Sequence, residues 1–330
     1  RPSGPTYKLT ESIQKARNNP RRRGRGPAFE SADVPDNFYR DGQLADQAIA
    51  DLKRLANQSQ PFFLAVGFFK PHLPFVAPKK YWDLYQPESI PMAANPFPPK
   101  NAPPLAMSNW GELRAYSDIP ATGPLTDQQK RTLKHGYYAC VSYVDAQIGR
   151  LLDELDRLKL RDRTIIIMWG DHGWKLGEHG GWCKHTNFEN DANAPLICSA
   201  PGQKAAGRSS NRLVEFVDIY PSLCDLAKLP LPAHLEGSSF APLLDAPDQP
   251  WKKAAFSQYP RAGGMGYTLR SGNWRYTEWR GRDGAVTARE LYDHSESDVA
   301  TDNVVDQPKY AAELQQMQAM LKAGPEAAQP

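Results

Sequence analysis

The sequence predicts an α/β fold in which helices cover both faces of a mostly parallel sheet. A helical pattern over residues 42–57 is followed by the apolar run 61–69, and a longer helical pattern precedes the apolar run 164–170. Both runs are short and do not alternate with polar residues, which is typical of strands buried on both faces. Helices that alternate with such strands favour a parallel sheet.

The elements of this domain have separate signals. Thr126 and Gln129 form a capping box before a helix whose apolar residues recur in steps of three and four as far as Leu158. A short strand is expected over 194–200, followed by a Pro-Gly turn, and a further helix over 212–229.

Residues 87–104 are too rich in proline for regular structure, and we interpret them as a rim over the functional site. The pattern changes near residue 250, where short segments separated by glycine and asparagine turns predict a small antiparallel sheet with a closing helix over 308–322. We therefore predict a domain over 1–250 and a small antiparallel α+β subdomain over 251–330.

Composition argues against several classes of protein. The formal net charge of +3 is too small to indicate nucleic-acid binding, and the basic run 21–26 is interpreted as a solvated loop rather than a polyanion patch. Four cysteines without paired spacing indicate neither a disulfide framework nor a zinc ribbon. No window is apolar enough for a membrane span, so we expect neither nucleic acid nor membrane as a partner.

Residues that carry chemistry follow two of the apolar runs. Asp171 and His172 come directly after the run 164–170. Lys70 and His72 follow the run 61–69. Because ligands bind beyond the carboxyl ends of parallel strands, we expect these four side chains at one edge of the sheet.

The stretch 169–185 could serve a metal, an anion or only a polar loop. Asp171 and His172 offer a divalent cation one carboxylate and one imidazole, and further ligands would have to come from elsewhere. A zinc site is an alternative. Its ligands would be His172, His179, Cys183 and His185, which are suitable residue types but match no standard spacing.

An anion site is better supported than zinc. Lys184 follows a Gly-Gly turn that lets the chain fold back over Asp171, so its ammonium could clamp a tetrahedral oxyanion. His72 stands in an extended segment between prolines and could be a general acid for a leaving alcohol, with a plain surface turn as the alternative. Glu178 and His179 are expected to support the loop through hydrogen bonds.

These motifs resemble those of the sulfatases of the alkaline-phosphatase superfamily, and within them the iduronate-2-sulfatase-like branch. The resemblance covers nearly the whole chain from about residue 30 and implies an alkaline-phosphatase-like fold, with 1–250 as the C-terminal portion of the catalytic domain. It rests on these stretches, in family order: PFFLAVGFFKPHLPF, DHGWKLGEHGGWCKH, APLICSAPG, VEFVDIYPSLCDLAKLPLP, LEGSSFAPLL, FSQYPR, GYTLRSGNWRYTEW and ELYDHSESD.

The resemblance implies roles for individual residues. Asp171 and His172 would be two ligands of a divalent metal, most often Ca²⁺ in this family. Lys184 and His72 would contact the sulfate, and His72 would donate a proton to the leaving oxygen.

Three further residues are assigned to substrate binding. By position in the family, Trp174 and His185 would lie beside the uronate ring. Lys70 follows the apolar run 61–69, as the proton donor His72 does. Iduronate enzymes tend to have Tyr where this chain has His185.

The chain departs from the family pattern in its nucleophile. Sulfatases use a formylglycine made within a C-x-P-S-R-type motif, and their first strand gives an Asp-Asp pair to the metal; this sequence contains neither. The resemblance therefore places the formylglycine in an N-terminal part that is not in this sequence and implies that this chain alone is inactive. We expect a part of a longer sulfatase; one chain of a processed two-chain precursor and a protein that has lost catalysis are the alternatives.

The function implied by the resemblance is hydrolysis of sulfuric esters on a sulfated uronate or another sulfated glycan, as in glycosaminoglycan degradation. A phosphodiesterase or phosphonate hydrolase of the same superfamily and a noncatalytic protein that binds sulfated glycans are the alternatives. Family members are usually periplasmic, secreted or lysosomal, and we expect export here.

Overall fold

The computed structural model describes residues 5–261 and 263–330. It contains two compact units, which are described separately below. The first comprises Arg1–Ala94 with Trp110–Asp162, and the second comprises Asn95–Asn109 with Arg163–Pro330.

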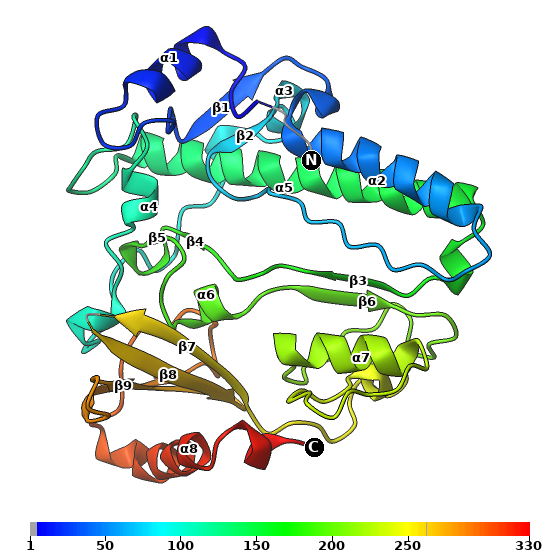
Figure 1. Cartoon of the computed structure of the whole chain (residues 1–330). Coiled ribbons are helices and arrows are strands. Elements are labelled where there is room, and N and C mark those ends of the chain that lie inside the picture. The colour runs from blue at the N-terminus through cyan, green and yellow to red at the C-terminus, as the bar shows by residue number, and fades with distance from the viewer. Residues whose placement is uncertain (1–4, 262) are drawn as a thin grey trace. The chain divides into compact units, whose positions relative to one another are not determined.

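The first unit is built around the long helix α5 (Figure 1). The capping box at the start of this helix is confirmed, because Gln129 N donates to Thr126 Oγ1 and Thr126 N donates to Gln129 Oε1. The strands β1 and β2 pair in parallel, with Phe29 opposite Phe75. The elements of this unit are α1 (Thr10–Asn18), β1 (Phe29–Ala32), α2 (Arg40–Ala56), β2 (Phe75–Pro78), α3 (Lys79–Trp82), α4 (Gly111–Arg114) and α5 (Asp127–Arg157).

A close approach between α5 and β2 explains one glycine inside the helix. A Cβ at Gly136 would lie 2.8 Å from Phe75 Cβ and 2.8 Å from Trp82 Cη2. Glycine lowers helix propensity, so its presence here indicates that packing of α5 onto the strand outweighs that cost. Phe75, Leu133 and Tyr143 are among the buried side chains of this core.

The second unit contains a two-stranded antiparallel sheet, β3 with β6, in which Ile167 lies opposite Cys198. Ile167, Leu196 and Cys198 pack against Ile219 of α7, whereas Ile197 is exposed. The elements before residue 250 are β3 (Ile166–Trp169), β4 (Lys175–Leu176), β5 (Trp182–Cys183), α6 (Glu189–Ala192), β6 (Leu196–Ser199), the 3-10 turn η6 (Phe216–Asp218) and α7 (Ile219–Leu226).

A four-stranded antiparallel sheet in the order β10-β9-β8-β7 follows in the same unit, and α8 covers it (Figure 1). Leu269, Tyr276 and Leu291 from the sheet pack with Met317 of the helix. This sheet and its helix confirm the prediction for 251–330, while the boundary at residue 250 stays a prediction. The bounds are β7 (Ala255–Arg261), β8 (Gly264–Ser271), β9 (Trp274–Arg280), β10 (Val286–Asp293) and α8 (Ala311–Ala323).

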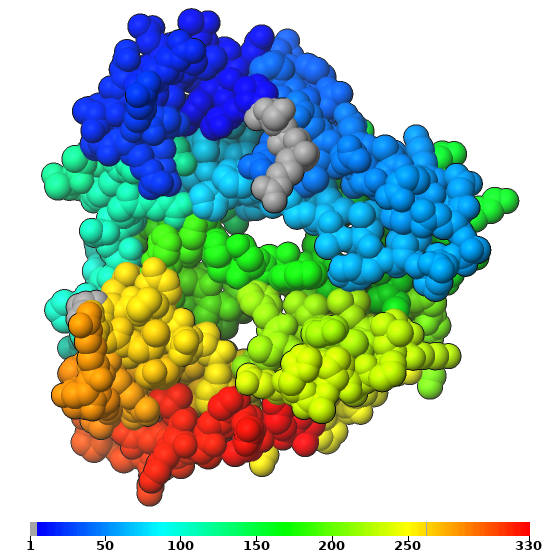
Figure 2. All heavy atoms as spheres, in the orientation of Figure 1, coloured from blue at the N-terminus to red at the C-terminus, as the bar shows by residue number. Residues whose placement is uncertain are grey.

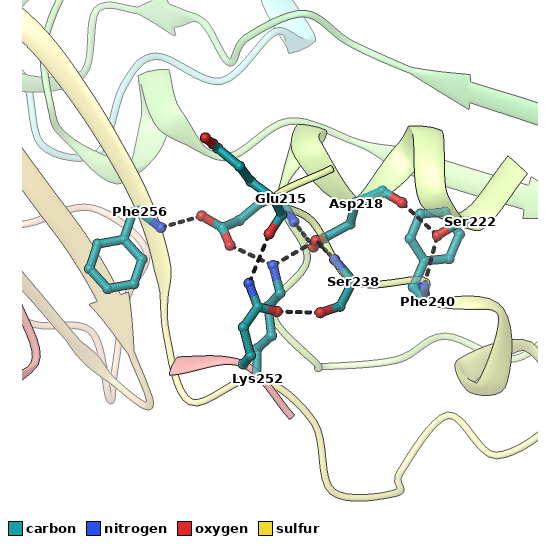
Figure 3. Close-up of polar contacts among 9 residues, drawn as sticks. Glu215, Asp218, Ser222, Ser238, Phe240, Lys252 and Phe256 are labelled. Carbon is teal, nitrogen blue, oxygen red and sulfur yellow. Dashed lines mark hydrogen bonds and ion pairs between the residues drawn. The ribbon is translucent and has the colours of Figure 1, made fainter. Parts of the chain in front are cut away.

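A buried lysine joins this sheet to the start of α7 (Figure 3). Lys252 Nζ lies 2.7 Å from Glu215 Oε2 and 2.6 Å from Asp218 Oδ1. Phe256 N, on β7, donates to the other oxygen of Glu215 at 2.8 Å. The pair of acidic side chains thereby holds η6, α7 and β7 at fixed positions within the second unit.

One predicted strand is wrong. No strand is assigned within residues 61–69, and none of the sheets formed by the described residues includes them. Phe63 is 80% exposed, so this run is not buried on both faces as its composition indicated. The helix predicted over 212–229 is also shorter than expected, because regular α-helix begins only at Ile219.

Candidate functional site

Lys70 is used to hold the backbone around His72 in the first unit. Its Nζ donates to His72 O at 3.1 Å and to Pro74 O at 2.5 Å. Burial lowers the pKa of this ammonium. The carboxylate of Asp41 accepts the backbone N–H groups of Phe69 (3.0 Å) and Lys70 (2.8 Å), which fixes the approach to the histidine.

His72 has an oxygen opposite each ring nitrogen. Nδ1 lies 2.7 Å from Leu73 O, and Nε2 lies 2.8 Å from Glu112 Oε1. Each nitrogen needs a proton to donate, so the ring can donate to both oxygens only as the imidazolium. This arrangement suits a residue that delivers a proton, with Glu112 orienting the ring.

Asp171 and His172 lie next to each other in the second unit, just after β3. His172 Nε2 lies 3.6 Å from Asp171 Oδ1, and the Asp171 side chain is 87% exposed. His172 Nδ1 lies 2.8 Å from Gly173 O, a carbonyl that can only accept. This contact orients the ring so that Nε2 lies on the side of the carboxylate.

The series of contacts continues from His172 through Trp174 to Lys184. The Trp174 ring stacks on the His172 ring with 5.9 Å between centroids, and Lys184 Nζ lies 4.8 Å from the centre of the Trp174 ring. Cation–π contact holds the Lys184 ammonium against the same indole ring on which His172 stacks. The structure therefore brings together four of the residues predicted from sequence.

His185 has a different set of neighbours. Its ring lies 5.8 Å from the Tyr259 ring, and its carbonyl accepts a hydrogen bond from Arg261 Nη2. Both neighbours come from β7. Sequence reasoning missed them because more than seventy residues separate them from the loop.

The backbone on either side of Lys184 is strained. Cys183 has φ 68° and His185 has φ 87°, in the left-handed region that favours glycine. Such residues cluster at functional sites, where surrounding contacts hold them in place. One such contact is the pairing of Cys183 with Lys175 across β4 and β5.

Glu178 and His179 have the structural roles predicted for them. Glu178 Oε2 accepts from Leu176 N at 2.6 Å, and His179 Nε2 lies 2.7 Å from Ala300 O. The His179 ring is buried against Phe188, and burial lowers its pKa to about 4. This places His179 among backbone and apolar atoms and removes support for the zinc alternative.

A divalent metal fits Asp171 and His172 as part of a donor set. A carboxylate oxygen and an imidazole nitrogen face the same space, and the exposed carboxylate needs no protein hydrogen bond to be broken. Among the residues that the structure describes, no group of three or more His, Cys, Asp or Glu side chains could hold a metal ion. These two residues alone would leave most of the coordination sphere to other ligands.

Two solved structures have the same fold as this chain. A phosphonate monoester hydrolase from Silicibacter pomeroyi matches with a TM-score of 0.76 and 23% identity, over 96% of this chain and 66% of its own. A protein solved with its substrate D-glucosamine-2-N,6-O-disulfate matches with a TM-score of 0.74 and 22% identity, over 86% of this chain and 69% of its own. The fold is therefore alkaline-phosphatase-like, as the sequence motifs implied.

The chain belongs to the sulfatase family, whose model matches residues 6–229. A second model, described as the C-terminal part of N-sulphoglucosamine sulphohydrolase, matches residues 177–326. The iduronate 2-sulfatase of Mus musculus is 35% identical over 76% of this chain, so the resemblance to this branch is confirmed. The chain spans 58% of the length of that relative.

No helix in the described part of the chain is both long and apolar enough to cross a membrane.

Proposed function

We propose that this chain supplies the sulfate-binding loop and the proton donor of an enzyme that hydrolyses sulfuric esters on a sulfated uronate or another sulfated glycan. The series of contacts from Asp171 through His172 and Trp174 to Lys184 supports this proposal, because it carries a carboxylate, an imidazole and an ammonium on one loop. A sulfate ester presents three oxygens over which such charges can act.

Each residue has a role in this proposal. Lys184 binds a sulfate oxygen and stabilises the charge that develops on it, and His72 protonates the departing sugar oxygen. Asp171 and His172 hold a divalent metal, with Ca²⁺ proposed from the family, that would neutralise sulfate charge. Because Ca²⁺ and Mg²⁺ both prefer oxygen ligands, the imidazole makes a transition metal such as Mn²⁺ a necessary comparison.

The nucleophile is proposed to be a formylglycine contributed by residues outside this sequence. This chain alone would then be inactive, either as a part of a longer polypeptide or beside an N-terminal chain of the same precursor. Export to the periplasm, the extracellular space or the lysosome is proposed from the relatives.

Sugar recognition is proposed for Trp174 and His185. The Trp174 ring carries the Lys184 ammonium on its face, so a sugar beside it would meet both an aromatic surface and a cation. Lys70 is engaged with backbone oxygens, and we therefore propose an indirect contribution to binding through the position of His72.

The test is sulfate release from a sulfated uronide by the full-length protein, with and without Ca²⁺. Metal-dependent release supports the proposal. Two alternatives have distinct outcomes: preferential cleavage of a phosphonate monoester, favoured by the fold of the Silicibacter enzyme, or saturable binding of the sulfated oligosaccharide without any release.

A further inference from the structure

The arginines of the basic run 21–26 in the first unit differ in their contacts. Arg21 donates to Tyr116 O at 2.5 Å and to Ile119 O at 2.6 Å. Arg25 donates to Glu112 O at 2.8 Å. Among the described residues, Arg22 and Arg23 have no acidic partner and are exposed.

The loop that carries these side chains is fixed. Asn19 Nδ2 donates to Arg25 O at 2.6 Å and to Ala115 O at 2.9 Å, and Gly24 N donates to Ala16 O at 2.8 Å. The exposed guanidinium groups are therefore presented by an ordered backbone that is already tied to the rest of the unit. Such preorganisation lowers the entropy lost when a ligand binds.

A surface cavity of 340 Å³ lies between α1 and this loop. Ile13, Ala16 and Tyr7 contribute apolar surface to it, and Arg17 and Arg23 also line it. The Tyr7 hydroxyl is occupied, since it donates to Pro27 O at 2.8 Å, so the ring presents carbon atoms to the cavity. An apolar wall beside two cations suits a ring that carries an anionic substituent.

The segment that lines most of the cavity has an excess of basic residues. Seven basic side chains and one acidic side chain lie from Pro5 to Arg25, and the acidic one, Glu11, is paired with Lys15 at 2.5 Å. The chain as a whole carries only +3, so this segment holds a local excess of positive charge. It belongs to the N-terminal part of the chain, which is dark blue in Figures 1 and 2, where colour marks chain position.

In place of the solvated loop expected from the sequence, we propose that Arg17, Arg22 and Arg23 form a second binding site, separate from the loop of Lys184, for the sulfate groups of a polymeric sulfated glycan. Arginine binds sulfate oxygens through paired N–H donors, and the cavity accepts one sugar ring. Single-stranded nucleic acid is a poorer fit, because no aromatic side chain between Pro5 and Arg25 is exposed for base stacking. The choice of a sulfated glycan as the anion rests on the proposed function.

The test uses the 330-residue chain on immobilised heparin with a salt gradient. We expect Arg22→Ala/Arg23→Ala to elute at lower salt and to bind a heparin oligosaccharide about fivefold or more weakly, as loss of exposed charge contacts implies. The matched control is Arg282→Ala, an exposed arginine of the second unit with no acidic partner among the described residues. Elution of the double variant together with the wild type would overturn the proposal.

A second measurement tests the cavity without a charge change. In a titration with a sulfated disaccharide, the Ile13 methyl resonance is expected to shift while that of the buried Ile90 stays in place. Equal or tighter retention on single-stranded DNA would overturn the choice of partner. Heparin binding does not require sulfate release, so this site and the proposed activity can fail independently.

Discussion

Lys175 Nζ lies 2.5 Å from Asp191 Oδ1, and both side chains are almost completely buried in the second unit. Thr186 links the two, since Lys175 Nζ donates to its Oγ1 at 2.7 Å and its N–H donates to Asp191 Oδ2 at 2.8 Å. The ion pair therefore fixes both ends of the loop that carries Lys184, next to a strained backbone. The local sequence contains no pattern that predicts the Lys175–Asp191 ion pair.

Replacing one member of the Lys175–Asp191 ion pair should destabilise the protein more than replacing both. Lys175→Met leaves the Asp191 charge buried, and Asp191→Asn leaves the ammonium buried, so each should lower the free energy of unfolding by about 3 kcal/mol. In the double variant the amide oxygen at position 191 still accepts a hydrogen bond from Thr186, and no charge is buried. Urea unfolding should show that the double variant loses much less free energy of unfolding than the two single variants added together. A loss equal to that sum would contradict this account.

The buried carboxyl of Glu290 should make stability depend on pH. Trp279 Nε1 and the Tyr292 hydroxyl donate to its two oxygens, but no cation of the described residues is paired with it, and burial raises its pKa to about 7. The folded state then binds the proton more tightly than the unfolded state. This contribution is fully present below pH 4.5 and is lost as pH rises to about 7, by roughly 3 kcal/mol.

Glu290→Gln removes the titration while keeping a side chain of the same shape. The free energy of unfolding of the wild type minus that of the variant should fall between pH 4.5 and pH 7.5. Measuring both proteins at each pH cancels the contribution of other groups. A difference that does not change with pH would show that the carboxyl does not titrate in this range.

Exposed apolar residues of the β3–β6 sheet should make the isolated chain self-associate. Ile197 is 58% exposed and Trp169 is 47% exposed, on opposite faces of a sheet of two strands. Such open apolar strands favour association. Ile197→Lys should reduce light scattering of the 330-residue chain. Ala206→Lys adds the same charge at an exposed position and should not; equal effects of both would point to net charge alone.

Glu112 should act through His72. In the full-length protein, His72→Ala should lower kcat for sulfate release about a hundredfold, and Glu112→Ala should lower it by less. Since the carboxylate only orients the ring, Glu112→Ala added to His72→Ala should cause little further loss. Multiplicative losses in the double variant would mean that Glu112 has a separate role.

The fold could be predicted where the signal is local. The capping box at Thr126, the strand at 166–169 and the C-terminal sheet all have periodicity or turn residues of their own. The run 61–69 is apolar but has no partner strand in the described structure, and pairing is a non-local property that composition cannot report. The parallel pair β1–β2 was also missed. Each of its strands has only four residues, and their pairing is likewise a non-local property.

The candidate site shows the same division. Asp171, His172, Trp174 and Lys184 lie within fourteen positions of one another in the sequence, so a motif could reveal them together. Glu112 lies forty positions from His72, and Tyr259 lies on β7, more than seventy positions from His185. Contacts of this kind are created by tertiary packing, and their residue types carry no signal by themselves.

The central claim is that Lys184 binds the sulfate that is released. The most direct measurement is kcat/KM for a sulfated uronide in the full-length protein carrying Lys184→Ala, with Lys204→Ala as the matched control at an exposed lysine. We predict a loss of about a hundredfold for Lys184→Ala and none for the control. Turnover of Lys184→Ala at the rate of the control would contradict the account.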